Sequence, residues 1–487
     1  MDVKQLSKDK KRFETSKIKS IISVFIIILF ILPSISVQAD INKDRNYFDA
    51  YWKHYPYHQP GTEIIFPVDE GSHETSEFPI EWWYVNFHLI GQTTGNEYGS
   101  FVAFYKIELP IAEKKEVRIF SISDLASEKT YTNVQIGVLT ASTDHLDLSF
   151  EYITNDITPD NIIESNVYIE NIISQNQETL NTQDSTSKSM NQTTLGSSSF
   201  NDDIEKSNLI NQEFASQESS DGYIHSDHWY TKYNDQGLLP FQYILDISGN
   251  SQQDNQVMSI VVDMDCIKKP LMVGGDGKIE LGYEQRTSFY YCLTKVIVNG
   301  LITVQDITEK VAGYAWIDHQ WGDFLNLNNP TYGMVVSYEW FSIKLNDNRE
   351  ILGGNTWDQE TGEKINNSFS NGLNLINSDG SLELLEQYSI VPKSYWYDSL
   401  TNKIFASKWN IIEESKSINL IITPEYNDQM MRVAEDSPLI LQILNKIIPG
   451  SCFWEGVCTV SGSINGELIA GKAYVELTHH YDTQHGK

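Results

Sequence analysis

Hydrophobic and polar residues alternate along many short segments of this chain, and this period-two pattern is typical of β-strands. The clearest segment runs from Glu81 to Leu89. An extended chain places Trp83, Val85, Phe87 and Leu89 on one face and Trp82, Tyr84, Asn86 and His88 on the other. Large rings therefore stand on both faces of this predicted strand.

Similar runs of Val, Ile, Tyr, Phe and Trp, bounded by Gly, Asn, Asp and Pro, predict further strands. These are Ser100–Leu109, Val117–Ile122, Asn133–Leu139, Phe241–Ser248, Val257–Met264, Ser288–Val298, Leu301–Val304, Gly333–Leu345, Glu350–Trp357, Ser407–Glu413, Ile418–Pro424, Trp454–Gly462 and Glu467–Leu477. One short helix is predicted over Ser437–Lys446, with Pro438 in its first turn. Closely spaced strands with few helical patterns favour an all-β sandwich or barrel over a parallel α/β sheet.

A short motif that occurs twice in the sequence indicates two barrels in tandem. Glu81-Trp82-Trp83 begins one alternating strand, and Glu339-Trp340-Phe341 begins another. The sequence LNLNNP at 325–330 reads as a linker between them. We therefore expect a first domain over residues 45–325 and a second over 331–487.

Two segments are expected to belong to neither barrel. Residues 174–220 consist mostly of Asn, Gln, Ser and Thr and offer little apolar surface, which predicts a disordered insertion in the first domain. Residues 1–39 contain a basic segment and an apolar run from Ile21 to Leu32, with Val37 and Ala39 before a plausible cleavage point. This layout predicts a secretory signal, with an uncleaved N-terminal anchor as the alternative, so the rest of the chain should be exported and secreted or held at the cell surface.

The composition excludes several classes of protein. The 487 residues include 35 basic and 66 acidic side chains, a formal charge of −31, and there is no basic stripe that would attract nucleic acid. Only one stretch is nearly continuous in apolar residues, which excludes a polytopic membrane protein. Four cysteines fit an oxidising compartment without requiring one. Cys452 and Cys458 would lie too far apart on one strand to bond to each other, while pairing of either with Cys266 or Cys292 stays open.

The densest group of chemically useful residues lies between Gly313 and Asp323, in the sequence GYAWIDHQWGD. In an extended chain, Trp316, Asp318 and Gln320 point one way, and Ile317, His319 and Trp321 point the other. A carboxyl group set between aromatic rings loses hydration, which raises its pKa and makes it a proton donor. The alternative is a structural role, in which Asp318 accepts hydrogen bonds from a turn and Trp321 fills a barrel end.

Three glutamates stand inside predicted strands: Glu81, Glu455 and Glu476. A buried carboxylate is costly unless it has a partner, and His73 or a tyrosine hydroxyl could provide one. Each glutamate is interpreted either as a structural hydrogen-bond acceptor or as a ligand contact. Histidines at 225 and 228, and at 479, 480 and 485, complete no recognised zinc spacing, so neither a metal nor another cofactor is expected.

Taken in order, these clusters resemble the carotenoid 1,2-hydratase (hydroxyneurosporene synthase) and AttH-like family, whose members look like two lipocalin-like barrels. The resemblance rests on PVDEGSH at 67–73, EWWY at 81–84, Tyr290-Tyr291, GYAWIDHQWG at 313–322, FWEG at 453–456 and GKAYVEL at 471–477. It implies a hydrophobic, isoprenoid-type ligand and hydro-lyase chemistry, with Asp318 as proton donor and Trp316 and His319 beside it. The residues expected to contact the ligand are His73, Glu81, Trp82, Tyr84, Tyr290, Tyr291, Trp321, Trp454, Glu455, Tyr474 and Glu476. The hydratases carry a His and a Trp upstream of the Asp motif, where this chain has Phe289, Tyr290, Tyr291 and Cys292.

Addition of water to an unactivated alkene begins with protonation, so the site needs a neutral acid, rings that stabilise a cation and a polar group that positions water. We therefore expect Asp318 to be largely buried, in a cavity, within hydrogen-bond reach of a ring or an imidazole. Two other functions remain open. One is a carrier that binds a lipophilic molecule without changing it, and the other is a cell-surface accessory protein of a transport system.

Overall fold

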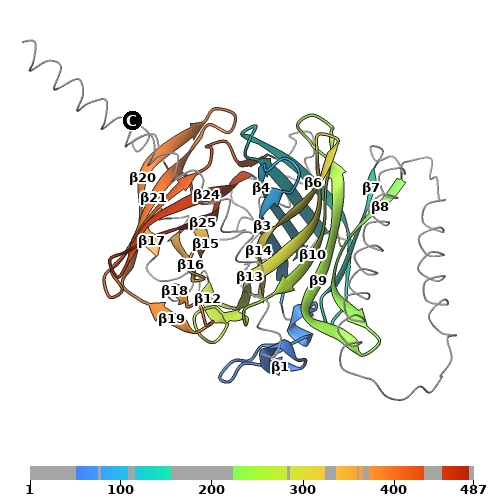
Figure 1. Ribbon diagram of the computed structural model, residues 1–487, viewed down its shortest axis with the longest axis horizontal. Coiled ribbons are helices and arrows are strands. Elements are labelled where there is room, and N and C mark those ends of the chain that lie inside the picture. The colour runs from blue at the N-terminus through green and yellow to red at the C-terminus, as the bar shows by residue number, and fades with distance from the viewer. Residues whose placement is uncertain are drawn as a thin grey trace, which may run out of the picture. The chain divides into compact units, whose positions relative to one another are not determined.

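The computed structural model describes residues 51–74, 78–107, 116–154, 223–281, 286–323, 336–358, 361–365, 372–432 and 452–481. The chain divides into two units, residues 1–53 and 54–487. The first unit is described only at the 3-10 turn η2 (Tyr51–Lys53). The second unit contains every described strand, and Figure 1 shows it as almost entirely β.

The first large sheet closes into a barrel. Its ten barrel strands are β3 (Ile80–Gly91), β4 (Glu97–Ile107), β5 (Glu116–Asp124), β6 (Lys129–Ala141), β7 (Asp147–Thr154), β8 (Tyr223–Asn234), β9 (Gly237–Asn250), β10 (Val257–Cys266), β13 (Arg286–Val304) and β14 (Ile307–Gly322). Neighbours in this series pair antiparallel, β14 pairs with β3, and β10 pairs with β13 to complete the ring. Two short strands, β11 (Leu271–Met272) and β12 (Lys278–Leu281), pair with β13.

The second large sheet is an open half-barrel. In spatial order its strands are β19 (Leu382–Leu385), β18 (Leu373–Ile376), β16 (Glu350–Asp358), β15 (Val336–Leu345), β25 (Glu467–Leu477), β24 (Cys452–Ile464), β22 (Ile418–Pro424), β21 (Lys403–Glu413) and β20 (Tyr388–Asp398). The short strands β17 (Lys364–Ile365) and β23 (Met430–Arg432) pair with β16 and β24. Within the described residues no pairing joins β19 to β20. The expected tandem lipocalin-like architecture is confirmed, with one closed barrel and one open sheet.

A small substructure lies against the first barrel. The strands β1 (Tyr57–His58) and β2 (Ile65–Phe66) pair with each other, and the 3-10 turn η3 (Val68–Glu70) follows. Phe66 is fully buried against the ring of Tyr291 in β13, with centroids 4.9 Å apart. This contact fixes η3, and with it His73, beside β3 and β14.

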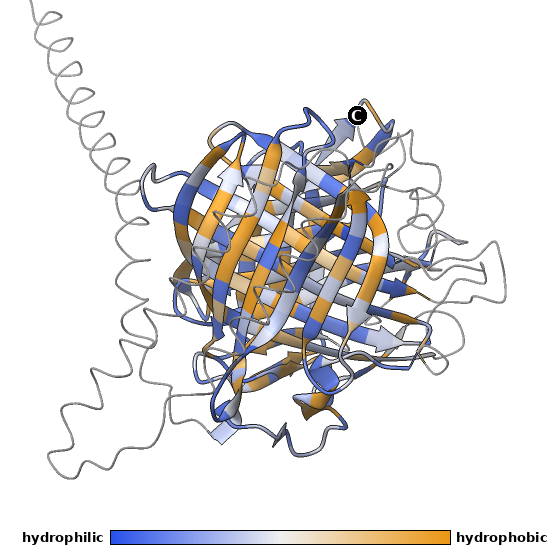
Figure 2. Cartoon of the chain, turned by 90° about the vertical axis from the view of Figure 1, so that its right-hand side faces the viewer, coloured by the Kyte–Doolittle hydropathy of each residue, from blue (hydrophilic) through white to orange (hydrophobic). Residues whose placement is uncertain are grey.

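The side chains of the two sheets form three buried compartments. Alternation along each strand, visible as alternating orange and blue in Figure 2, sends neighbouring residues to different compartments. Trp83 and Phe104 point into the first barrel, while Phe341 and Trp409 belong to the core of the second sheet. The third compartment, which we call the inter-sheet layer, lies between the sheets and is lined by residues of both: Tyr84, Tyr105, Tyr290, Cys292, Trp316, Trp340, Phe453 and Tyr474.

The prediction of two separate strands between residues 288 and 304 is wrong. The segments Ser288–Val298 and Leu301–Val304 form the single strand β13, and no turn separates them. A Cβ atom at Gly300 would lie 2.1 Å from the carbonyl oxygen of Val261. This glycine permits the close approach of β10 and β13 without interrupting the strand.

Most other predicted strands overlap described ones, but several described strands were not predicted. The missed long strands are β7, β8, β14 and β20, of which β14 carries the Trp-x-Asp motif. The predicted helix at 437–446, the leader at 1–39, the insertion at 174–220 and the linker at 325–330 lie outside the described residues. Cys266, Cys292 and Cys458 are buried thiols, and the side chain of Cys452 is not among those described.

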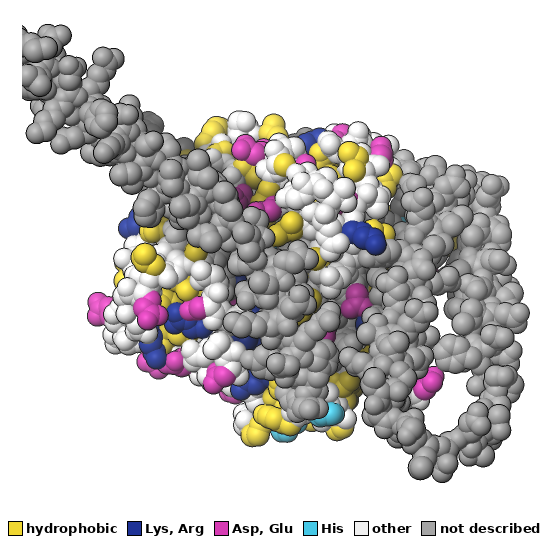
Figure 3. Space-filling model, viewed as in Figure 1, with side chains coloured by type: hydrophobic (Ala, Val, Ile, Leu, Met, Phe, Trp, Pro, Cys, Tyr) yellow, Lys and Arg dark blue, Asp and Glu magenta, His cyan; other side chains and the backbone are white. Residues whose placement is uncertain are grey.

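The surface carries charged side chains of both signs. On the face shown in Figure 3, basic side chains lie in small separate groups among acidic ones. In the part of the chain that the structure describes, no helix has the length and apolar character to cross a membrane.

Candidate functional site

Strand β14 presents its central motif to two different compartments. Trp316 faces the inter-sheet layer, with its ring centroid 6.3 Å from that of Trp340. His319 faces the first barrel, where its ring stacks on Trp83 with centroids 4.8 Å apart. Asp318 lies on the same face as Trp316. The three residues expected to act together are therefore divided, two in the inter-sheet layer and one inside the barrel.

The carboxyl group of Asp318 is held in an aromatic environment. Its residue is 3% exposed, and the indole Nε1 of Trp316 donates a hydrogen bond to Oδ1 at 2.8 Å. Burial raises the pKa of Asp318 to about 7, because the surroundings disfavour the charged form. The expected burial and ring contact of Asp318 are confirmed, and near neutral pH a large fraction of this acid carries its proton.

Two further carboxyl groups enter the inter-sheet layer from the second sheet. Glu455 on β24 and Glu476 on β25 are directly opposite each other. The hydroxyl of Tyr84 lies 3.4 Å from Glu455 Oε2, and the hydroxyl of Tyr338 donates to Glu476 Oε1. Burial raises the pKa of both glutamates, and repulsion from Glu476 raises that of Glu455 further. Like charges this close favour a state in which the pair keeps a proton.

Donor groups and rings complete the lining around Asp318. Cys292 is its partner across the β13–β14 ladder, and polar interactions with the Cys292 thiol and the Tyr290 hydroxyl favour the charged carboxylate and lower its pKa against the effect of burial. Trp340 Nε1 donates to the Tyr290 hydroxyl at 3.0 Å, and the Trp340 ring lies 5.6 Å from that of Tyr84. The inter-sheet layer thus combines three protonatable acids with electron-rich rings, an arrangement that can protonate a weak base and stabilise a cation.

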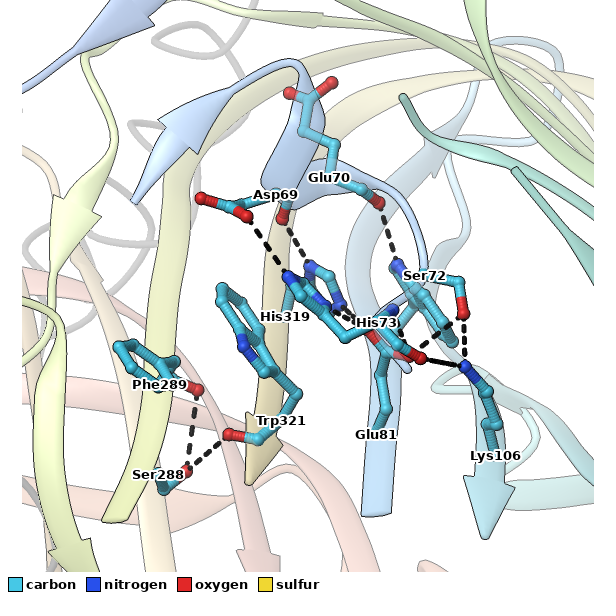
Figure 4. Close-up of polar contacts among 11 residues, drawn as sticks. Asp69, Glu70, Ser72, His73, Glu81, Lys106, Ser288, Phe289, His319 and Trp321 are labelled. Atoms are coloured by element: carbon cyan, nitrogen blue, oxygen red, sulfur yellow. Dashed lines mark hydrogen bonds and ion pairs between the residues drawn. The ribbon is translucent and has the colours of Figure 1, made fainter. Parts of the chain in front are cut away.

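A second polar cluster lies inside the first barrel, under η3. Figure 4 shows His73, His319 and Glu81 pointing toward one another. His73 Nδ1 is 2.6 Å from Glu81 Oε1, and His319 Nε2 is 3.0 Å from the same oxygen. The other carboxylate oxygen, Oε2, lies 3.2 Å from the hydroxyl of Ser72 and 3.3 Å from Lys106 Nζ. The predicted need of Glu81 for a partner is therefore met by two imidazoles, one of them His73.

Burial and hydrogen bonds shift the pKa values of all three residues in this His-Glu-His cluster. Burial opposes the charge on Glu81, but hydrogen bonds from His319 and His73 outweigh it and lower its pKa to about 2. Burial also opposes the charged ring of His73, yet its bonds to Asp69 and Glu81 raise the pKa overall. For His319 burial prevails and lowers the pKa. Glu81 is therefore an anion at all moderate pH values.

A family model described as AttH-like matches residues 171–480, which is well over half of the chain. The chain belongs to the AttH-like family. The comparison with curated proteins finds no match for this AttH-like sequence.

Solved structures share the AttH-like fold of this chain. An AttH protein of Nitrosomonas europaea superposes with a TM-score of 0.54 at 19% identity, covering 87% of this chain and 99% of its own. Kievitone hydratase of Nectria haematococca gives a TM-score of 0.50 at 13% identity, covering 87% of this chain and 98% of its own. At these identities the similarity shows the fold.

The remaining residues predicted to contact a ligand fall into separate places in the AttH-like fold. Tyr474 lies in the inter-sheet layer, and Trp82 packs against it. Tyr291 and Trp321 lie beside His319 inside the barrel. Trp454 belongs to the core of the second sheet and donates to the carbonyl of Asn427 at 2.6 Å. The predicted set is thus spread over all three compartments.

Several residues of both clusters were missed by the sequence analysis. Trp340 and Tyr338 contribute a ring and a hydroxyl to the inter-sheet layer, and Asp69 and Lys106 support the His-Glu-His cluster. Trp340 belongs to the repeated motif Glu339-Trp340-Phe341, which was interpreted only as evidence of a repeat. Lys106 pairs with Glu81 across the neighbouring strands β3 and β4, and this pairing depends on a register that the residues themselves do not specify.

Proposed function

We propose that this AttH-like protein is a hydratase-type enzyme that adds water across a C=C bond of a hydrophobic, isoprenoid-type molecule in the inter-sheet layer. The observation that carries the proposal is the buried Asp318, whose pKa of about 7 leaves a large fraction of it protonated near neutral pH while Trp316 donates a hydrogen bond to it. The predicted leader supports a place of action outside the cytoplasm.

The reaction has two balanced steps. The Asp318 hydroxyl transfers its proton to one alkene carbon, so that a C–H bond forms, the C=C π bond breaks and a tertiary cation remains. Facing rings such as Trp340 and Tyr84 stabilise the cation. The oxygen of a water molecule then bonds to the cationic carbon and its excess proton passes to the Asp318 carboxylate, which regenerates the acid.

One finding from the comparisons and one resemblance seen in the sequence support this chemistry. Kievitone hydratase, whose fold the chain shares, is by its name an enzyme of the same reaction class. The resemblance to carotenoid 1,2-hydratases also includes the Asp motif. Where those enzymes carry a His and a Trp, this chain has Phe289, Tyr290, Tyr291 and Cys292. Cys292 pairs with Asp318 across the β13–β14 ladder, and Tyr290 and Cys292 both lower its pKa. We therefore assign the positioning of the acid to a phenol and a thiol in this protein.

The test begins with lipophilic molecules that copurify with the full chain, identified by mass spectrometry. Each is incubated with the protein in ¹⁸O-labelled water, and we expect a product heavier by one labelled water molecule. Asp318→Asn should retain binding but lose about 10²-fold to 10⁴-fold in rate. The exposed Asp323 of the same motif supplies the control, since Asp323→Asn should convert the molecule at the wild-type rate.

Two results would count against the proposal. If the copurified molecule stays bound and takes up no label, the carrier function replaces the hydratase. If Asp318→Asn incorporates label as fast as the wild type, the proton comes from another group.

A further inference from the structure

The His-Glu-His cluster lies on the opposite face of β14 from the proposed proton donor, and the proposed reaction does not use it. His73 Nδ1, His319 Nε2 and a carboxylate oxygen of Glu81 all lie within 4.8 Å of one another. Glu81 and His319 are each 1% exposed at the side chain, while His73 is 15% exposed. Three atoms that can act as metal ligands therefore converge in a largely buried site, in which His73 is the most exposed residue.

The hydrogen bonds of His319 leave a lone pair facing Glu81. Its Nδ1 lies 2.9 Å from the backbone carbonyl of Asp69, which can only accept, so Nδ1 carries the hydrogen. In a neutral ring Nε2 then has no hydrogen and faces a carboxylate oxygen at 3.0 Å. Two acceptors at this distance repel unless a positive species lies between them.

His73 lies between two carboxylates. Its Nε2 is 3.1 Å from the carboxylate of Asp69, and its Nδ1 is 2.6 Å from Glu81 Oε1. Both partners only accept, so a neutral ring donates to one of them and turns a lone pair toward the other. With the hydrogen on Nε2, toward Asp69, Nδ1 offers its lone pair to the centre of the cluster, as Nε2 of His319 does.

We propose that His73, Glu81 and His319 bind a divalent transition-metal ion, for which Zn²⁺ is the best fit. Two imidazoles and one carboxylate are a known three-residue zinc set that leaves one position for water. Tetrahedral zinc with bonds of about 2.0 to 2.1 Å needs ligand atoms about 3.3 Å apart. The present separations of 2.6 and 3.0 Å, with all atoms within 4.8 Å, bracket that spacing.

The surroundings have the features of a metal site. In such sites a histidine donates its outer N–H to a carboxylate or a backbone carbonyl, and Asp69 provides both acceptors here. The rings are also held in orientation, because His73 stacks on Trp321 at 4.0 Å between centroids and His319 stacks on Trp83. Nitrogen and carboxylate ligands favour zinc and its transition-metal neighbours over calcium or magnesium.

The ligands come from three separate segments, which explains why no sequence spacing revealed them. His73 follows η3, Glu81 is near the start of β3 and His319 is on β14. The site therefore ties η3 to two barrel strands.

The experiment measures metal content and affinity on the full chain. Protein dialysed against Zn²⁺ and then against metal-free buffer should retain one zinc per chain by inductively coupled plasma mass spectrometry. His73→Gln and Glu81→Gln should each weaken zinc binding by more than about 100-fold, and Asp69→Asn by about 10-fold to 100-fold. His145→Gln, at a partly exposed histidine outside the cluster, should bind zinc as the wild type does.

A measurement on the unaltered protein keeps the test valid if a variant fails to fold. X-ray absorption at the zinc edge should show nitrogen and oxygen ligands at about 2.0 to 2.1 Å with scattering from two imidazole rings. Sulfur in the first shell, zinc retention by folded Glu81→Gln, or no retained zinc in the wild type would each overturn the proposal. In the last case added protons, rather than a metal, occupy the centre of the cluster.

Discussion

Burial of one carboxyl group, that of Asp318, sets the protonation state on which the proposed reaction depends. An exposed aspartate is almost fully ionised at neutral pH, whereas the pKa of Asp318 is about 7. Its hydrogen bonds from Trp316 and Cys292 act in the opposite direction and lower the pKa, so desolvation is the larger effect. At neutral pH a much larger share of this carboxyl group is therefore in the protonated form that a general acid needs.

The shifted pKa of Asp318 predicts a pH-dependent stability. Between its ordinary value of 3.8 and about 7, the folded protein keeps a proton that the unfolded chain releases, so the free energy of unfolding falls as the pH rises. From pH 5 to pH 8 the wild type should lose about 2 kcal/mol more than Asp318→Asn. Urea denaturation at several pH values measures this difference.

Parallel stability curves for the wild type and Asp318→Asn would show that Asp318 is ionised in the fold. Asp323→Asn again serves as the control, because Asp323 is exposed and its replacement should leave the pH dependence unchanged.

The sequence identified much of the chemistry at the residue scale but not its assembly. Aromatic neighbours two positions away were enough to predict a buried Asp318, and a glutamate inside a strand was enough to predict a partner for Glu81. The pairing of Glu455 with Glu476 depends on the register of β24 and β25, which the residues themselves do not specify. His319 and Asp318 are adjacent in sequence, yet alternation separates them into different compartments.

At the scale of the element, β14 is the strand on which both polar clusters depend. It pairs with β3 and β13 along almost its whole length, so its side chains are held on both sides. Gly313 allows β14 to approach β3 closely, since a Cβ atom there would lie 2.0 Å from the carbonyl oxygen of His88. This carbonyl group belongs to the backbone of β3, which cannot move aside as a flexible side chain can.

Gly313→Ala should therefore destabilise the fold by about 1 to 3 kcal/mol, the usual cost of forcing extra volume into a packed site. Thermal and urea unfolding measure the effect. Gly353→Ala is a matched control, because its Cβ would come closest to a side-chain atom, Leu373 Cδ1 at 2.5 Å, and would meet no backbone atom. Equal effects at the two glycines would contradict the close-approach explanation.

Element prediction succeeded where one face of a strand was clearly apolar and failed where polar residues point into a barrel. β8 includes His225, Asp227 and His228, whose pattern does not suggest a strand, yet Asp227 is buried in an ion pair with Arg118 at 2.8 Å. Because the partner of Asp227 lies on β5, far away in sequence, the burial of this aspartate could not be inferred locally.

At the scale of the whole described fold from His54 onward, the inter-sheet layer joins the closed barrel to the open sheet. Trp340 is central to it, being 3% exposed, packed against Tyr84 and Trp316, and bonded to the Tyr290 hydroxyl. A large ring that contacts the other sheet on several sides couples the stabilities of the two sheets.

Trp340→Ala should lower the free energy of unfolding by about 3 to 5 kcal/mol, because it removes a large buried side chain and a hydrogen-bond donor. Denaturation should remain a single transition when followed by circular dichroism and by tryptophan fluorescence. Leu468→Ala, at a side chain that is 91% exposed, should change stability little. Two separate transitions in the wild type would show that the sheets are independent.

Because the acids are divided between the two sheets, they are not all present at the same stage of synthesis on the ribosome. Asp318 is synthesised before Glu455 and Glu476, which belong to β24 and β25, the last two described strands. A nascent polypeptide can complete the barrel and still lack two of the three acids of the inter-sheet layer. The inter-sheet layer is therefore complete only after synthesis has passed residue 476, and we expect a product truncated before β24 to fold its barrel without the proposed activity.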